Sequence, residues 1–226
     1  MTTIVRAVLW DLDGTIVDSG DLHWHAFQET MAGESIALTY EEFASFFGWK
    51  NDRILTRLLG PDASPKRITR LGHEKEMAFR RLAAERGVQA LPGAAEWIAR
   101  LRADGWRQSI ASSAPRDNIT AMLAALGLTD AFDGIVAAED VSTGKPDPEV
   151  FLTAAARLGA APGTSIVVED AEAGVEGARR AGMKSIGVSR LTTLPADVFV
   201  RSLTELDAGA FAQLIGVVSG DGQRRG

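Results

Sequence analysis

The chain has 226 residues, 46% of them hydrophobic, which suffices for one large or two small domains with packed cores. Its formal net charge is −6 and its basic residues form no cluster, so a nucleic-acid partner is disfavoured. It contains no cysteine, which excludes disulfides, thiolate catalysis and cysteine-ligated zinc.

The first residues lead directly into an apolar run, which leaves no room for a signal peptide. No apolar stretch approaches the roughly 20 residues that span a membrane. We therefore expect a cytoplasmic protein without a membrane partner. The sequence does not define the oligomeric state, although it favours a monomer.

The first predicted strand is the apolar run from Ile4 to Trp10, which ends at two carboxylates, Asp11 and Asp13. In open parallel α/β sheets, ligands bind beyond the carboxyl ends of the strands. Side chains two residues apart in an extended segment point to the same side, so both carboxylates can face one cavity. Because neighbouring carboxylates repel each other, the pair predicts a bound cation.

Between residues 19 and 87 the patterns are helical, and we find no convincing strand there. Thr39 begins a capping box, Asn51 is suited to cap a short helix, and Ser64-Pro65 is a typical start of a long one. The region therefore predicts a small all-helical domain inserted after the first strand. Its expected helices are an amphipathic segment after residue 19, then 40 to about 48, 51–59 and 65–87.

From residue 91 onwards, strand and helix patterns alternate. Such repeats imply right-handed crossovers and a Rossmann-like α/β fold, a parallel sheet with helices on both faces. We expect strands at 107–111, 135–137, 165–168, 184–188 and 198–200, and helices ending at 105 and near 126, 158, 181 and 215. The predicted core is 1–18 with 88–218, the inserted helical domain is 19–87, and the Gly-rich tail 219–226 is expected to be disordered.

Three further polar segments lie in the alternating region. Ser112 and Ser113 follow the second strand, where hydroxyl groups and the first N–H groups of the next helix can bind an anion; an ordinary helix cap is the alternative. Lys145 lies in a Gly-Lys-Pro-Asp-Pro segment that the prolines stiffen, although a lone lysine is usually solvated. Glu169 and Asp170 end another strand and offer oxygen ligands suited to Mg²⁺, although an aspartate there also caps the next helix.

In this order the four segments resemble the motifs of the haloacid dehalogenase (HAD) superfamily in its phosphate-transferring form, starting with Asp-Leu-Asp-Gly-Thr from residue 11. The similarity is to β-phosphoglucomutase-like and phosphatase members with a helical cap. It implies that Asp11 is a nucleophile that becomes phosphorylated and that Asp13 is the general acid and base. The implied phosphate contacts are Asp13, Gly14, Ser112, Ser113 and Lys145, and the implied Mg²⁺ ligands are Asp11, the backbone carbonyl of Asp13, Asp170 and, directly or behind these, Glu169.

In this family, an insertion after the first motif is a cap that closes over the site, excludes water and contacts the leaving group. For Trp49 the alternative is a core aromatic, and for Lys50 and Arg53 it is a solvated helix face. A half-exposed helical position is the alternative for His23. The candidate substrate contacts are His23, Trp49, Lys50, Asn51, Arg53 and Arg116.

The chain departs from β-phosphoglucomutases at several positions. These enzymes carry a lysine where Phe47 stands, an arginine where Asn51 stands, and a Lys-Asn pair where Pro115 and Arg116 stand. The differences count against the mutase substrate.

The sequence thus predicts a Mg²⁺-dependent phosphatase that acts on a small phosphorylated metabolite, a sugar phosphate, through an aspartyl phosphate. The alternative is a β-phosphoglucomutase-type phosphotransferase, in which a sugar hydroxyl replaces water. A non-enzymatic phosphate-binding protein or a signalling receiver domain is a further alternative. Receivers, however, are about half this length and have no helical insertion.

Overall fold

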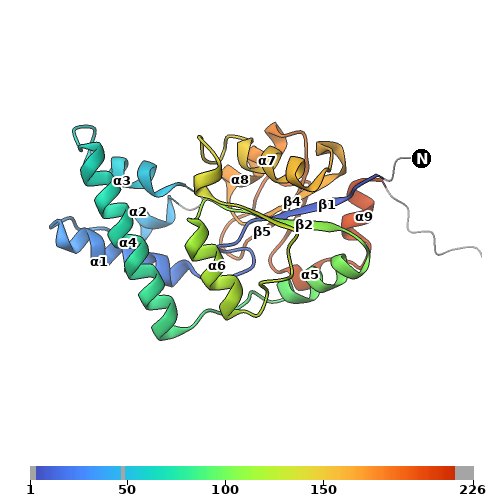
Figure 1. Ribbon diagram of the computed structural model, residues 1–226, viewed down its shortest axis with the longest axis horizontal. Helices are drawn as coiled ribbons and strands as arrows, with labels where there is room; N and C mark the ends of the chain where they lie inside the picture. The colour runs from blue at the N-terminus through green and yellow to red at the C-terminus, as the bar shows by residue number, and fades with distance from the viewer. Residues whose placement is uncertain (1–3, 47–48, 217–226) are drawn as a thin grey trace, which may run out of the picture.

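The computed structural model describes residues 4–46 and 49–216. Its strands form one parallel sheet in the order β3-β2-β1-β4-β5-β6 (Figure 1). The strands are β1 (Ala7–Trp10), β2 (Arg107–Ala111), β3 (Gly134–Val136), β4 (Ser165–Glu169), β5 (Lys184–Val188) and β6 (Val198–Val200). Because β1 is central, the residues that follow it lie between the ends of β2 and β4.

Helices cover both faces of the sheet, as the alternating pattern predicted (Figure 1). Val8 and Trp10 of β1 pack in one hydrophobic cluster with α5 (Ala94–Ala103), α6 (Arg116–Ala125) and α9 (Ala210–Leu214). Ala7 and Leu9 pack in another with α7 (Glu149–Leu158) and α8 (Glu172–Arg180). Burial on both faces explains why β1 is apolar at every position rather than alternating.

The remaining helices form a separate layer beside the carboxyl end of the sheet (Figure 1). They are α1 (Gly20–Gly33), α2 (Tyr40–Ala44), α3 (Asn51–Leu59) and α4 (Pro65–Arg86). This layer, which we call the cap, has its own hydrophobic cluster, which includes Phe27, Phe43 and Leu55. None of the described residues between 19 and 87 forms a strand.

Two linkers join the cap to the sheet and run side by side. The N–H of Asp18 donates to the carbonyl of Gln89 (3.0 Å), and the N–H of Leu91 donates to the carbonyl of Ile16 (2.8 Å). We propose that these bonds mark the hinge of a cap domain comprising residues 19–87, with 1–18 and 88–218 as the core. The predicted disorder of 219–226 concerns residues outside the described ranges.

Several predicted boundaries were wrong. Asn51 is not the N-cap of α3, because Lys50 holds that position and the Asn51 amide instead donates to Glu76. The first strand begins at Ala7 rather than Ile4, and α2 ends at Ala44, before the predicted position. The last helix, expected from about residue 206 to 215, spans only Ala210–Leu214. Among the described helices, none combines the length and apolarity that a membrane crossing requires.

The packing of α7 can be tested with two neighbouring residues. Phe151 is completely buried beneath the sheet, whereas Leu152 is 41% exposed. We expect Phe151→Ala to lower the free energy of unfolding by about 3–5 kcal/mol through the cavity it leaves. Leu152→Ala should change it by about 0.5 kcal/mol or less in the same urea titration. Equal losses would show that α7 does not pack on the sheet through this face.

Candidate active site

The turn after β1 is shaped by a close approach to the end of β4. The N–H of Asp11 still donates to the carbonyl of Val168 (2.9 Å), so the chain leaves the sheet only after this residue. Gly14 has a positive φ of +82°, and a Cβ atom added to it would lie 2.0 Å from Oδ2 of Asp170. Only glycine fits both the backbone and the space. The turn therefore brings Asp170 against the segment that carries Asp11 and Asp13.

Three carboxylates meet at this edge of the sheet: one oxygen atom from each of Asp11, Glu169 and Asp170 lies within 4.8 Å of the other two. Burial raises the pKa of Asp11 to about 8, although Lys145 opposes the shift. Burial, with the charges of Glu169 and Asp11, also raises the pKa of Asp170 well above its usual range. The cluster therefore holds more negative charge than its surroundings compensate, and a divalent cation would relieve the repulsion.

Lys145 is the positive charge within this cluster. Its Nζ lies 2.5 Å from Oδ1 of Asp11 and 2.5 Å from Oε1 of Glu169, and the residue is only 2% exposed. Although burial disfavours the ammonium, the two carboxylates outweigh it and raise the pKa of Lys145. The side chain is thus a fixed cation beside Asp11.

The carboxylates differ in how many partners they already have. Glu169 accepts from Lys145 with one oxygen and from the N–H of Ala171 (2.9 Å) with the other. The Asp170 carboxylate forms no hydrogen bond or salt bridge with the part of the chain that the structure describes. Asp11 and Asp170 are therefore better placed to bind a metal directly, with Glu169 holding Lys145 behind them.

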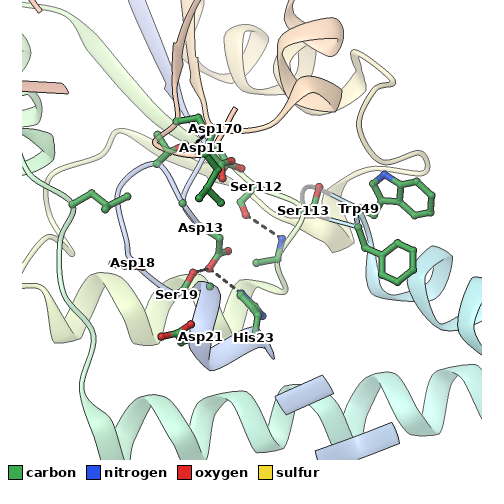
Figure 2. A pocket seen from close by; sticks show the side chains of 18 of the residues that line it. Asp11, Asp13, Asp18, Ser19, Asp21, His23, Trp49, Ser112, Ser113 and Asp170 are labelled. Carbon is green, nitrogen blue, oxygen red and sulfur yellow. Dashed lines mark hydrogen bonds and ion pairs between the residues drawn. The ribbon is translucent and has the colours of Figure 1, made fainter. Parts of the chain in front are cut away.

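The predicted anion-binding serines line the same cavity (Figure 2). The Oγ of Ser112 accepts from the N–H of Ala114 (3.1 Å), which leaves its proton available to donate. Ser113 lies in the short segment between β2 and α6.

Asp13 lies at the start of a chain of hydrogen bonds that runs into the cap. Its Oδ1 accepts from the hydroxyl of Ser19 (2.5 Å) and lies 3.0 Å from Nε2 of His23 (Figure 2). Nδ1 of His23 lies 2.8 Å from Nζ of Lys75, which also donates to Glu76 (2.8 Å). Since an ammonium can only donate, Nδ1 must accept, and Nε2 carries the proton that His23 donates to Asp13. Burial would raise the pKa of Asp13, but the hydrogen bonds from His23 and Ser19 and the charge of Lys75 lower it.

Glu76 joins the cap to the core at the end of this chain. Besides Lys75, it accepts hydrogen bonds from the amides of Asn51 in the cap and Asn118 in α6. Asn118 in turn accepts from Arg80 of α4 (2.9 Å). The burial of Glu76 acts to raise its pKa, but Lys75 and the other donors lower it, so the carboxylate stays charged.

Sequence reasoning missed Ser19, Lys75, Glu76 and Asn118, although one signal was present. Apolar residues of α4 recur at positions 68, 71, 79 and 82, and Lys75 occupies the position between the two pairs. A lysine on the buried stripe of an amphipathic helix needs a partner in the interior.

The candidate substrate contacts divide into two groups. His23, Trp49 and Asn51 line the cavity between cap and core. Lys50, Arg53 and Arg116 are not among its lining residues, and each has a partner elsewhere. Lys50 donates to the carbonyl of Val141 (3.1 Å), Arg53 stacks on Trp49 (3.6 Å to the ring centroid), and Arg116 pairs with Asp140 (2.5 Å).

The cavity has a volume of about 330 Å³, suited to a small metabolite. It contains Asp11, Asp13, Ser112 and Asp170 on the core side, and aromatic residues of the cap on the other. Lys75 reaches it from α4.

Comparison with known proteins agrees with this geometry. The family model for haloacid dehalogenase-like hydrolases matches residues 8–188, which include the turn after β1, Lys145 and Asp170. The chain belongs to this family. The β-phosphoglucomutase of Bacillus subtilis is 30% identical to it, over 89% of this chain and 92% of the relative.

Two further HAD-family matches cover nearly whole proteins. The fructose-1-phosphate phosphatase YqaB of Escherichia coli is 30% identical, over 81% of this chain and 96% of its own length. The crystal structure of the β-phosphoglucomutase of Clostridium difficile superimposes with a TM-score of 0.85 at 26% identity, covering 94% of this chain and 97% of that one. The HAD family resemblance and the Rossmann-like fold predicted from the motifs are thereby confirmed.

The position of Glu169, which binds Lys145, can be tested by replacing the glycine that lies against it. Gly174 lies in α8, and an added Cβ would lie 1.9 Å from Cδ of Glu169. Replacing glycine by alanine within a helix normally stabilises it by about 1 kcal/mol. We expect Gly174→Ala to lower the melting temperature instead, because Glu169 must move. Gly72→Ala in α4 is the control, since its Cβ would meet only Leu55 at an ordinary 3.6 Å. A Gly174→Ala protein as stable as this control would contradict the packing.

Proposed function

We propose that this HAD-family enzyme is a Mg²⁺-dependent phosphatase that hydrolyses the phosphate monoester of a small sugar or related metabolite. The observation that carries the proposal is the placement of Lys145 between Asp11 and Glu169, together with the fact that Asp11 and Asp13 both line the cavity. A cationic group at the nucleophile allows a phosphate dianion to approach it.

Asp11, Asp170 and the backbone carbonyl of Asp13 would hold the metal ion. When bound, the ion neutralises phosphate charge and orients the phosphoryl group. Gly14, Ser112, Ser113 and Lys145 would hold the phosphate oxygens, through N–H groups, hydroxyls and the ammonium.

Asp11 supplies the nucleophilic oxygen. A carboxylate oxygen of Asp11 forms a bond to phosphorus while the bond from phosphorus to the ester oxygen breaks, which gives an aspartyl phosphate and an alcohol. A water molecule then attacks phosphorus, and the bond to Asp11 breaks. Asp11 is restored and inorganic phosphate leaves.

Asp13 moves the proton in both halves of the reaction. It gives a proton to the departing ester oxygen and later takes one from the attacking water. In the free protein the pKa of Asp13 is lowered by His23 and Ser19 against the effect of burial, so the carboxylate form prevails. A phosphate dianion beside it favours the protonated form that the first step needs. Ser19 and His23 keep the carboxyl group oriented for both transfers.

A β-phosphoglucomutase-type phosphotransferase is the second candidate, favoured by the similarity to two such enzymes. Both reactions share the aspartyl phosphate and differ in whether water or a sugar hydroxyl receives the phosphoryl group. Phe47 and Asn51 replace a lysine and an arginine of the mutases, which favours the phosphatase.

A panel of phosphate esters assayed with Mg²⁺ separates the two reactions. We expect phosphate release from at least one sugar phosphate and no glucose 6-phosphate from β-glucose 1-phosphate. Asp11→Asn should reduce phosphate release to background, because the amide is not a nucleophile. Glucose 6-phosphate formed faster than phosphate would establish the mutase reaction instead.

Metal binding can be measured without turnover. At 100 times its dissociation constant, Mg²⁺ should stabilise the folded protein by about 2.7 kcal/mol, measured as a rise in melting temperature. Asp170→Asn should abolish the rise. Asp21→Asn, which changes a carboxylate that lines the cavity but lies outside the acidic cluster, should retain it. A rise that survives Asp170→Asn would place the metal elsewhere.

The proton transfer by Asp13 can be tested with esters that differ in leaving group. Asp13→Asn should slow sugar phosphate hydrolysis by about 10²–10⁴-fold. With p-nitrophenyl phosphate, whose leaving group needs no proton, the variant should release one equivalent of nitrophenolate quickly and the rest slowly. Equal slowing of the first equivalent for both esters would exclude Asp13 as the acid.

A further inference from the structure

The cap side of the cavity carries polar residues, among them Asp21, His23 and Asn51, and in addition an apolar wall. The wall consists of Phe27, Phe43, Phe46, Trp49 and Ile54, of which all but Trp49 are buried. Their rings support one another, with centroids 5.9 Å apart for Phe27 and Phe43 and 5.5 Å apart for Phe46 and Trp49. Figure 2 shows Trp49 among the residues that line the same pocket as Ser112 and Ser113. The wall is thus preformed and belongs to the packed interior of the cap.

Four of the polar cap groups that line this cavity already have partners: His23, Asn51, Lys75 and Glu76. Asp21, which also lines it, is a carboxylate and offers no positive charge. The amide of Asn51 donates to Glu76, and Lys75 donates to both Glu76 and His23. Glu76 accepts from Asn118 as well. These groups bind one another and Asp13, so none of them is a vacant cation for a second anionic group of a substrate.

The two cations of the cap segment that follows Gly48 lie outside the lining. Nζ of Lys50 is bound to the carbonyl of Val141, and its stem lies against Gly144, where an added Cβ would come within 2.8 Å of Cγ. The guanidinium of Arg53 lies over the ring of Trp49. Lys50 therefore fastens the cap to the core, and Arg53 supports the apolar wall.

A second phosphate group would be poorly accommodated against this wall. It carries nearly two negative charges at neutral pH, and removing such a group from water without a partner is strongly unfavourable. The C–H face of a sugar ring, a deoxygenated carbon or an aromatic ring would instead pack on the aromatic side chains.

From this contrast we infer that the enzyme selects monophosphate esters whose alcohol is uncharged and presents an apolar face, and discriminates against bisphosphates. The inference rests on the proposed phosphatase function and specifies its substrate class. The aromatic wall holds the alcohol, while the phosphate stays at Asp11 and Lys145.

One feature of the core could bind a second anion in another way. Arg190 and Arg201, which follow β5 and β6, also line the cavity and are exposed, with Nη1 of Arg201 donating to the carbonyl of Arg190 (3.4 Å). They belong to the core loops rather than to the cap wall. The test therefore includes their replacement.

The test compares matched esters that differ by one phosphate, such as fructose 1-phosphate and fructose 1,6-bisphosphate, or glucose 1-phosphate and glucose 1,6-bisphosphate. Calorimetric binding to the Asp11→Asn protein with Mg²⁺ measures affinity without turnover, and wild-type kcat/KM measures hydrolysis. We expect each monophosphate to be favoured over its bisphosphate by at least about 100-fold, given the cost of burying an unpaired charge. Trp49→Arg should reduce this ratio at least about tenfold by supplying a cation, whereas Met77→Arg, at an exposed position of the cap outside the cavity lining, should leave it unchanged.

Bisphosphates that bind as tightly as the monophosphates would overturn the inference. If their affinity then falls in Arg190→Ala or Arg201→Ala, the second phosphate belongs to the core loops. Failure of the proposed function is a separate result: no ester is hydrolysed by the wild-type protein, whatever the binding ratio. A preference for monophosphates in binding supports the inference in either case.

Discussion

The site depends on one buried interaction, the ammonium of Lys145 held between the carboxylates of Asp11 and Glu169. Three carboxylates converge at the carboxyl edge of a parallel sheet, where burial raises the pKa of Asp11 and Asp170. One lysine offsets part of this repulsion, and the remainder creates the demand for a divalent cation. The same imbalance makes the cluster suited to a divalent cation, and in the proposed mechanism to a phosphate group held beside that cation.

The cap also contributes residues to the hydrogen bonds that hold Asp13. A continuous set of hydrogen bonds runs from Asp13 through His23 and Lys75 to Glu76, and from there to Asn118 of the core. Asp13 follows β1, His23 lies on α1, Lys75 and Glu76 lie on α4, and Asn118 lies on α6. The orientation of Asp13 is therefore tied to the position of the cap, and under the proposed mechanism this would couple cap closure to proton transfer.

The sheet and the core-side residues could be predicted because each lies next to a strong local signal. The apolar β1 stops at Asp11, and turns mark the other strand ends, so parallel topology brings the strand-end segments to one edge of the sheet. The importance of Ser112 and Lys145 was inferred from the family resemblance. Lys75 and Asn118 could not be predicted in this way, since their partners are 52 and 42 residues away in the sequence. Lys50 and Arg53 were expected at the substrate because their segment resembles the substrate-specificity loop of the family, and Arg116 because it follows the second motif. A long side chain reaches several possible partners, however, and sequence position does not decide among them.

The most direct test of the account is acid quenching during turnover, followed by peptide mass mapping of the enzyme. When the reaction is quenched with Mg²⁺ and a substrate ester present, we expect one phosphoryl group on the peptide that contains Asp11. This group should disappear once the substrate has been consumed. In a Lys145→Met protein, we expect neither this phosphoryl group nor hydrolysis of the ester. Full wild-type hydrolysis with a phosphoryl group on another residue, or with an enzyme that is never phosphorylated during the steady state and in single turnovers, would contradict the account.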